Sequence, residues 1–261
     1  MKIMVCLKQV PHQDARLDVR SDGTWIQEEN IKFEINSYDT YALEEALRMK
    51  DAAGSGEVLV VSIGPDRVTQ SLRTALGMGA DRAVHVKDPE ADAADALGAA
   101  KLLAAVAKAE SPDVIFTGLM ADDGNAAAVG PMLAELLGIP STTSVMKVEK
   151  TNGSLTAERE LEGGALEVVE LQRPCLLAVQ TGINQVRYAS LKGIMAAKKK
   201  PIETRTVADL GLAGKVGTAA NKVKIEKIAP PPKGKGAEMV TGATGDVVGR
   251  LVSKIKELGL L

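Results

Sequence analysis

Short apolar runs alternate with longer segments of helical period over residues 1–140, and this alternation constrains the fold more than any other feature of the chain. Continuous apolar runs bounded by Gly, Pro or Asp are typical of strands buried on both faces of a parallel sheet. The expected strands are Ile3–Leu7, Val58–Ile63, Ala83–Val86 and Asp113–Thr117. The expected helices, with apolar stripes at helical spacing, are Tyr38–Ala53, Arg67–Leu76, Asp95–Ala109 and Ala126–Leu137. The pattern predicts an α/β fold with a doubly wound, mostly parallel sheet.

The pattern changes after Pro140. Three strand-like runs follow and are separated by hairpin signals at residues 151–153 and 162–164. These runs are Ser144–Glu149, Ser154–Leu161 and Leu166–Leu171, and the apolar strand Cys175–Gln180 comes after them. We therefore expect a β-meander appended to the α/β lobe.

The last part of the chain is predicted to be a helical arm. Residues 229–236 are rich in Pro, Gly and Lys, which is typical of a solvent-exposed connector. The connector leads to Asp246–Leu258, where aliphatic residues recur at helical spacing. Such a helix packs either on its own domain or on another chain, and the pattern leaves both open. We expect an α/β domain over residues 1–228 and a C-terminal arm over residues 229–261.

Composition excludes several classes of function. The 32 Lys and Arg residues nearly balance 34 Asp and Glu residues, and the net charge of -2 does not draw the chain to nucleic acid or anionic lipid. Only 2% of residues are aromatic, which disfavours base stacking. Cys6 and Cys175 lie in apolar runs, which indicates buried reduced thiols, with no metal site. Without a recognisable signal peptide or membrane-length apolar run, we expect a cytoplasmic protein.

The segment from Val114 to Pro131 is the strongest candidate for ligand binding. A buried strand ends at Thr117, a loop with two carboxylates follows, and a helix of small residues is predicted to begin near Asn125. Free N–H groups at a helix start, beside small side chains, suit a phosphate or pyrophosphate, and ligands bind beyond the carboxyl ends of strands in such sheets. A packed Ala-rich helix that binds nothing is the alternative. The loop is neither a Walker A motif nor a GxGxxG motif.

No residue pattern predicts acid–base or nucleophilic catalysis. The chain has two histidines: His12 lies in a polar loop, where we expect it to be solvated, and His85 lies in an expected strand, where we expect it to be packed. A nucleophile elbow and paired catalytic carboxylates are both absent from the sequence. The chain therefore fits a nucleotide-binding protein without covalent chemistry of its own, and we assign no catalytic residue.

A second candidate site lies between residues 182 and 202. An apolar knob beside lysines would dock an acidic partner, because the apolar side chains supply affinity and the lysines raise the association rate. A basic helix end packed on the core is the alternative. The candidate docking residues are Tyr188, Leu191, Ile194, Met195, Lys198, Lys199 and Lys200.

Five ordered motifs, at residues 5–11, 35–46, 73–82, 118–130 and 187–200, together resemble the β subunit of electron-transfer flavoproteins over essentially the full length of the chain. The resemblance implies a heterodimer with an α subunit, whose mobile C-terminal domain holds most of a redox-active FAD. The β subunit would enclose part of that flavin and bind its own nucleotide in an α/β lobe of the adenine-nucleotide-binding type. That nucleotide is AMP in simple electron shuttles and a second FAD in electron-bifurcating members.

The resemblance also implies site residues and a function. The complex would accept electrons from dehydrogenases, or from NADH if it bifurcates electrons, and pass them to a redox partner such as a quinone oxidoreductase. The β subunit would be an electron-carrier subunit rather than a catalyst by itself. Residues 184–201 would form the loop that recognises partner dehydrogenases, with Leu191 as its buried knob, and the arm would contact the α subunit. The implied nucleotide-binding residues are Cys6, Asn36, Ser37, Tyr38, Asp39, Ile63, Thr117, Gly118, Met120, Asp123, Gly124, Asn125, Ala126, Ala127, Ala128 and Val129.

The loop over residues 123–130 departs from the simple shuttles, which carry a run of acidic or polar residues and then Gln-Thr-Gly. It is closer to the bifurcating pattern Asp-Gly-Asp-Thr-Ala-Gln-Val-Gly, yet Asn125, Ala126 and Ala128 replace its polar residues and Met120 replaces a usual Gln. We favour a second FAD, with AMP as the alternative.

The alternative function is that of a stand-alone adenine-nucleotide-binding regulatory protein of the universal-stress type. Such a protein would have no reason to keep residues 187–200 or the tethered helix. An adenylating enzyme with the same kind of lobe would need a pyrophosphate-binding loop near the first strand, and the sequence has none there.

Overall fold

The computed structural model describes residues 1–151, 153–232, 234 and 236–261. These residues form two compact units: the first comprises residues 1–17 and 28–225, and the second comprises residues 18–27 and 226–261. The larger unit carries the sheet and both candidate sites. The smaller unit carries the C-terminal helix.

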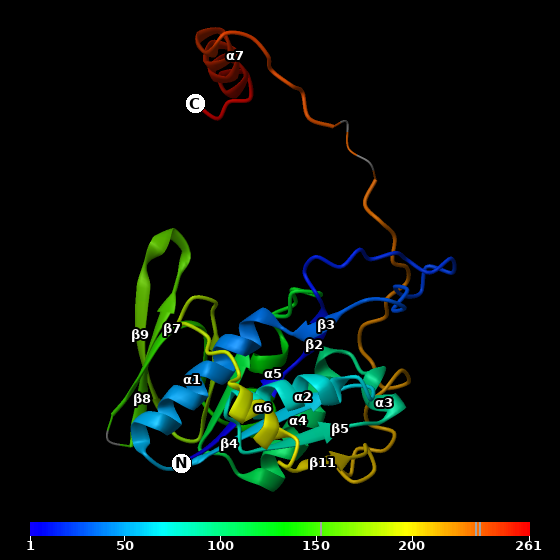
Figure 1. Cartoon of the computed structure of the whole chain (residues 1–261), viewed down its shortest axis with the longest axis vertical. Coiled ribbons are helices and arrows are strands. Elements are labelled where there is room, and N and C mark those ends of the chain that lie inside the picture. The colour runs from blue at the N-terminus through cyan, green and yellow to red at the C-terminus, as the bar shows by residue number, and fades with distance from the viewer. Residues whose placement is uncertain (152, 233, 235) are drawn as a thin grey trace. The chain divides into compact units, whose positions relative to one another are not determined.

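Within the described residues, the larger unit is built around a nine-stranded sheet in the order β11-β5-β4-β1-β6-β10-β7-β8-β9. Figure 1 labels its two edge strands, β11 and β9. Every neighbouring pair from β11 to β7 is parallel, and the β7–β8 and β8–β9 pairs are antiparallel. The mostly parallel sheet predicted from the sequence is confirmed. The strands are β1 Lys2–Leu7, β4 Glu57–Ile63, β5 Arg82–Val86, β6 Val114–Gly118, β7 Ser141–Lys150, β8 Ser154–Glu160, β9 Leu166–Gln172, β10 Cys175–Val179 and β11 Ile202–Arg205, and a separate antiparallel pair joins β2 Gln9–Pro11 to β3 Phe33–Ile35.

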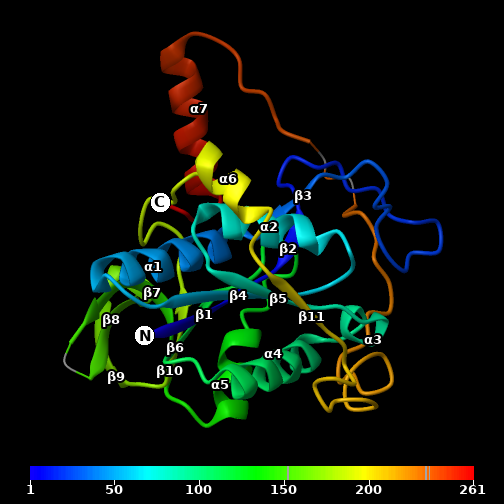
Figure 2. The ribbon, with the colours of Figure 1, turned by 60° about the horizontal axis from the view of Figure 1, so that its bottom comes forward.

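Helices cover both faces of the parallel sheet (Figure 2). Apolar residues of α1 (Ser37–Ala53) and α2 (Val68–Met78) join one core, and those of α4 (Ala96–Glu110) and α5 (Val129–Leu137) join the other. Alternate residues of β1 feed the two cores, because successive side chains of a strand point to opposite faces. The fold is therefore doubly wound, as predicted. The remaining helices are α3 Pro89–Asp92, the short 3-10 turn Glu162–Gly164, α6 Leu191–Ala197 and α7 Thr244–Glu257.

The predicted β-meander is present as β7, β8 and β9, but the strand after it lies elsewhere. β10 returns to the sheet and pairs in parallel with both β6 and β7. It therefore sits inside the sheet rather than at the end of the meander. The hairpin signal at residues 151–153 includes Asn152, which lies outside the described residues.

The predicted start of the helix after β6 is wrong. Residues 125–128 are loop, and α5 begins at Val129. Asn125 and Ala127 have positive φ angles of 48° and 49°, in the left-handed region that does not continue a right-handed helix. The small residues 126–128 therefore belong to a loop in front of α5.

The smaller unit consists of a short turn and the arm. Val19 and Ile26 form an antiparallel bridge, and the Ile228 N–H donates to the Gly23 carbonyl at 2.8 Å. The predicted helix Asp246–Leu258 is present as α7, and all of its residues are at least partly exposed. Residues 233 and 235 of the predicted connector lie outside the described residues. No helix in the described ranges is long and apolar enough to cross a membrane.

Candidate functional site

The carboxyl ends of β1 and β6 lie side by side, since the two strands are parallel neighbours, and the start of α1 meets them there. Two buried polar residues of this start, Asn36 and Asp39, are 1% and 6% exposed. Buried polar groups are stable only when they are hydrogen-bonded. The hydrogen-bond partners of Asn36 and Asp39 therefore show which segments are held together at these strand ends.

Asp39 fixes both strand ends to α1. One of its carboxylate oxygens accepts a hydrogen bond from the Lys8 N–H at 2.7 Å, and the other accepts one from the Gly118 N–H at 3.0 Å. A Cβ on Gly118 would collide with the Asp39 carboxylate, so only glycine fits there. Burial raises the pKa of Asp39 to about 7, although the two N–H donors favour the carboxylate.

The loop after β6 is attached to the start of α1 through side chains. The Asn36 amide donates to the Met120 carbonyl at 2.8 Å, and its oxygen accepts from the Asp122 N–H at 2.9 Å. The Asp122 carboxylate accepts from the Ser37 N–H at 2.9 Å and from the Ser37 hydroxyl at 2.8 Å. Sequence reasoning missed Asp122, because its partner lies 85 positions away and no local pattern marks the pair.

The other loop carboxylate is paired with the end of β1. The Lys8 ammonium lies 2.6 Å from the Asp123 carboxylate, and both side chains are partly exposed. Asp122 and Asp123 thus both have partners within this chain.

The end of β6 and the start of α5 contain a polar atom without a partner. Thr117 is 5% exposed, and its hydroxyl is buried with no hydrogen-bond partner. A Cβ on Gly130, in the first turn of α5, would lie 2.9 Å from that hydroxyl. No side chain caps α5, so its first N–H groups are free to bind an anion. These features fit the phosphate of a nucleotide.

The remaining predicted nucleotide residues lie on elements that meet this edge. Cys6 on β1 is buried, as predicted, and burial together with the nearby Asp39 carboxylate raises the pKa of its thiol. Tyr38, at the start of α1, and Ile63, at the end of β4, are half-buried, and residues 123–127 are exposed. The structure therefore brings β1, α1, β4 and the loop together at one edge.

The predicted docking segment presents an exposed apolar surface. Tyr188 is 97% exposed, Leu191 84%, Met195 63% and Ile194 46%. Lys198 and Lys199 are exposed beside them. Lys200 differs, because its ammonium donates to the Leu76 and Ala80 carbonyls at the end of α2, and burial lowers its pKa.

Ion pairs and backbone contacts hold this segment on α1 and α2. The Arg187 guanidinium lies 2.8 Å from the buried Glu44 carboxylate and 2.9 Å from Asp51. The Arg73 guanidinium donates to the Ala197 carbonyl at 2.6 Å and to the Lys200 carbonyl at 2.7 Å. The apolar surface is therefore exposed on a firmly anchored segment.

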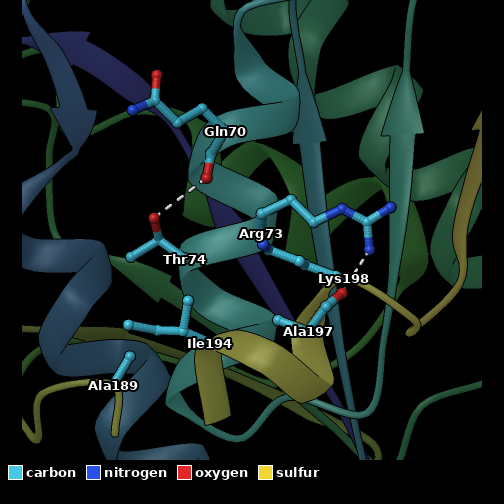
Figure 3. A pocket seen from close by; sticks show the side chains of 7 residues that line it. All are labelled: Gln70, Arg73, Thr74, Ala189, Ile194, Ala197 and Lys198. Atoms are coloured by element: carbon cyan, nitrogen blue, oxygen red, sulfur yellow. Dashed lines mark hydrogen bonds between the residues drawn. The ribbon is translucent and has the colours of Figure 1, made fainter. Parts of the chain in front are cut away.

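An open pocket of about 480 Å³ lies between α2 and α6 (Figure 3). Glycine allows the close approach of the two helices, since a Cβ on Gly193 would collide with the Gly77 carbonyl. The pocket adjoins the exposed apolar surface through Ile194. It is lined by Gln70, Arg73, Thr74, Ala189, Ile194, Ala197 and Lys198.

His85 lies next to Ser62 on the neighbouring strand β4, and the Ser62 hydroxyl donates its hydrogen bond to the Leu7 carbonyl at 2.7 Å. His85 is 2% exposed and its Nε2 lies 2.8 Å from the Gly64 carbonyl, so the prediction of a packed histidine is confirmed. His12 is half-buried rather than solvated, because the Glu34 carboxylate lies 3.6 Å from its Nε2 and its Nδ1 accepts from the Asp14 N–H.

Comparisons with known proteins identify a family and relatives of this chain. The sequence profile of a family described as "Electron transfer flavoprotein domain" matches residues 24–210. The chain is 39% identical to "Electron transfer flavoprotein subunit beta" of Methylophilus methylotrophus over 98% of both chains, and 38% identical to the protein of that name in Bradyrhizobium diazoefficiens over 100% of both. It is 37% identical to "Caffeyl-CoA reductase-Etf complex subunit CarD" of Acetobacterium woodii over 98% of both chains.

Proposed function

This chain belongs to the family of electron transfer flavoprotein β subunits, and on that premise we propose that it binds an adenine nucleotide of its own where β1, β6 and α1 meet. Members of the family associate with flavin and assemble with an α subunit. The bound flavin accepts and donates the electrons, so this chain's residues bind, orient and enclose rather than act as acids or bases.

The observation that carries the nucleotide site is the unpartnered Thr117 hydroxyl beside the uncapped start of α5. A buried hydroxyl without a partner costs free energy, and a phosphate oxygen would accept its hydrogen bond. Gly130, in the first turn of α5, lies close to this hydroxyl with no side chain between them. The uncapped N–H groups at the start of a helix attract anions. Thr117, Gly118 and Ala126–Val129 would therefore hold the phosphate, with Asn36–Asp39, Cys6 and Ile63 around the rest of the nucleotide.

A second FAD in this chain is the identity we favour for that nucleotide. Gly124 and the Val129-Gly130 pair support it, since this pattern lies closer to the bifurcating members than to the simple shuttles. The similarity to CarD, a subunit of a reductase complex, is in keeping with this choice. AMP is the alternative, and it would make the complex a simple one-flavin shuttle.

The exposed surface of α6 is the proposed docking site for a partner dehydrogenase or quinone oxidoreductase. Leu191 would enter a pocket of the partner, and Lys198 and Lys199 would attract its acidic residues. Lys200 would support this surface from below, through the carbonyls at the end of α2.

The test of the nucleotide site is a count of nucleotides. We would co-express this chain with its α subunit, purify the heterodimer, and quantify FAD and AMP after acid release. Two FAD per heterodimer are expected. One FAD with one AMP would contradict the second flavin but keep the site, and one FAD alone would contradict the site.

Two matched variants place the nucleotide in the fold. Thr117→Val removes the unpartnered hydroxyl and should lower the content of the second nucleotide while the redox flavin stays. Thr142→Val is the control, because Thr142 is also buried with an unpartnered hydroxyl but lies on β7, which β10 separates from β6. Equal losses in both variants would contradict the role of Thr117.

A further inference from the structure

The loop proposed to hold an anionic phosphate carries two adjacent carboxylates, Asp122 and Asp123. Like charges held together repel, so two free carboxylates here would weaken the binding of a phosphate. Neither carboxylate is free, however, and the way in which each is used indicates a structural purpose for the pair.

Asp122 acts as the missing cap of α1. The N-cap residue of this helix, Asn36, makes no capping hydrogen bond with its side chain, because that side chain binds the loop backbone at Met120 and Asp122. The Asp122 carboxylate accepts from the Ser37 N–H and hydroxyl instead. A carboxylate at this end of a helix is also stabilised by the positive end of the helix dipole.

Asp123 makes the second attachment, to Lys8 at the end of β1. The pair is partly exposed, and exposed ion pairs contribute little to stability. Asp122 is exposed as well, but it accepts two hydrogen bonds from Ser37, and its N–H donates to the buried Asn36, so this attachment has more contacts than the Asp123 pair. Together they fix the loop at residues 120–123, just before the backbone that approaches the phosphate.

We propose that Asp122 is a positioning residue, which staples the loop after β6 to the start of α1 and so holds residues 124–130 in place for the nucleotide phosphate. The inference rests on the proposed nucleotide site. A binding loop that is already ordered loses less conformational entropy when its ligand binds. Asp122 therefore strengthens nucleotide binding although its charge has the same sign as the phosphate.

The positioning role of Asp122 and simple charge repulsion predict opposite changes in the rate of nucleotide release when this side chain is replaced. If Asp122 acts only through its charge, removing that charge should slow the release of the nucleotide. If Asp122 is a staple, its removal should speed release, and a neutral side chain that still accepts from the Ser37 N–H should restore slow release.

The experiment follows the nucleotide during dialysis of the purified heterodimer. At timed intervals, AMP and FAD per heterodimer are measured after acid release for the wild type, Asp122→Ala, Asp122→Asn and Glu135→Ala. The last variant removes one negative charge from an exposed position on α5 and controls for charge alone. Loss of the β-bound nucleotide should be about fivefold faster in Asp122→Ala, the effect expected for a lost helix cap, and within about twofold of wild type in the other two.

Hydrogen exchange supplies a readout that does not depend on the nucleotide. Amides of residues 118–123 and the Ser37 amide should exchange faster in Asp122→Ala than in Asp122→Asn. If Asp122→Ala does not fold, Ser37→Pro opens the same contact from the helix side, at a position where proline is well tolerated. That variant should also release the nucleotide faster.

Two results would overturn the inference in different ways. Release from Asp122→Ala that is equal to or slower than in the wild type would contradict the staple while leaving the nucleotide site standing. A wild-type heterodimer without a β-bound nucleotide would contradict the proposed site, and the inference with it.

Discussion

At the scale of single residues, the buried carboxylate of Glu110 links three strands of the sheet. The Glu110 carboxylate accepts hydrogen bonds from Lys2 at 2.7 Å, from Arg205 at 2.9 Å and from Arg82. These partners belong to β1, β11 and β5. Burial alone would raise the pKa of Glu110, but the hydrogen bonds from Arg82 and Lys2 lower it from 4.5 to about 2.

Glu110→Gln should lower the free energy of unfolding by about 2 kcal/mol at pH 7, since three cations lose their shared carboxylate. The folded pKa lies below the unfolded one, so this stabilisation is complete above pH 4.5 and is lost as the pH falls towards 2. Urea unfolding at pH 7 and at pH 3 measures the difference, which should shrink at pH 3. Glu203→Gln is the control, because Glu203 is half-exposed and should contribute less than about 0.5 kcal/mol.

At the scale of elements, α6 is a helix whose exposed apolar side chains can contact a partner without any change in the fold. Leu191→Ala should raise the KM of the proposed partner dehydrogenase for this protein about tenfold, because a truncated interface anchor loses roughly 1.4 kcal/mol or more. Heterodimer assembly and flavin content should not change, since Leu191 is 84% exposed. Steady-state assays with the dehydrogenase measure the effect.

Leu136→Ala is the matched control, because Leu136 is also an exposed leucine on a helix, at 36% exposure. This variant should leave the KM unchanged. If Leu191→Ala instead lost flavin in proportion to its activity, the segment would be structural and the docking role would be contradicted.

The elements that sequence reasoning located are those whose signals are local. β1, β4, β5 and β6 are continuous apolar runs, and α1, α2 and α4 have apolar stripes, so burial on both faces of a sheet follows from their patterns. The start of α5 was misplaced because Ala126–Ala128 favour a helix, whereas positive φ angles at Asn125 and Ala127 keep the chain in a loop. A weak local preference does not reveal such a tertiary effect.

The two features that sequence reasoning could not reach are set by distant partners. The run Cys175–Val179 predicts a buried strand, but nothing in it specifies pairing with β6 and β7 rather than with β9. Asp122 likewise has no local signal, since it caps a helix that begins 85 positions earlier. The site residues themselves came from motifs, and their grouping at one edge follows from the parallel order of β1, β4 and β6.

At the scale of the whole molecule, the larger unit has its own sheet and cores, and the arm is a separate part of the chain. Truncating the chain after Pro232 should change the melting temperature of the isolated chain by no more than about 2 °C, because no residue of α7 is buried. The same truncation should abolish stable association with the α subunit, which we propose α7 contacts through its exposed apolar face. Light scattering after size-exclusion chromatography measures the association.

A full-length chain and a Gly249→Ala variant are the controls for this truncation. Gly249 lies within α7, where an added Cβ meets nothing within 4 Å, so the variant should keep the helix and the heterodimer. Undiminished association of the truncated chain would contradict the role of the arm.

The position of β10 also determines when this protein can fold during its synthesis. β6 is made early, but its second neighbour in the sheet is β10, and the edge strand β11 comes later still. In a nascent chain that has emerged only as far as β6, this strand can pair with β1 on one side but has its other backbone edge unpaired, which is a site for aggregation. β6 gains its second neighbour only after residue 179, about two thirds of the way along the chain, has been synthesised, so this strand edge stays open to aggregation until then.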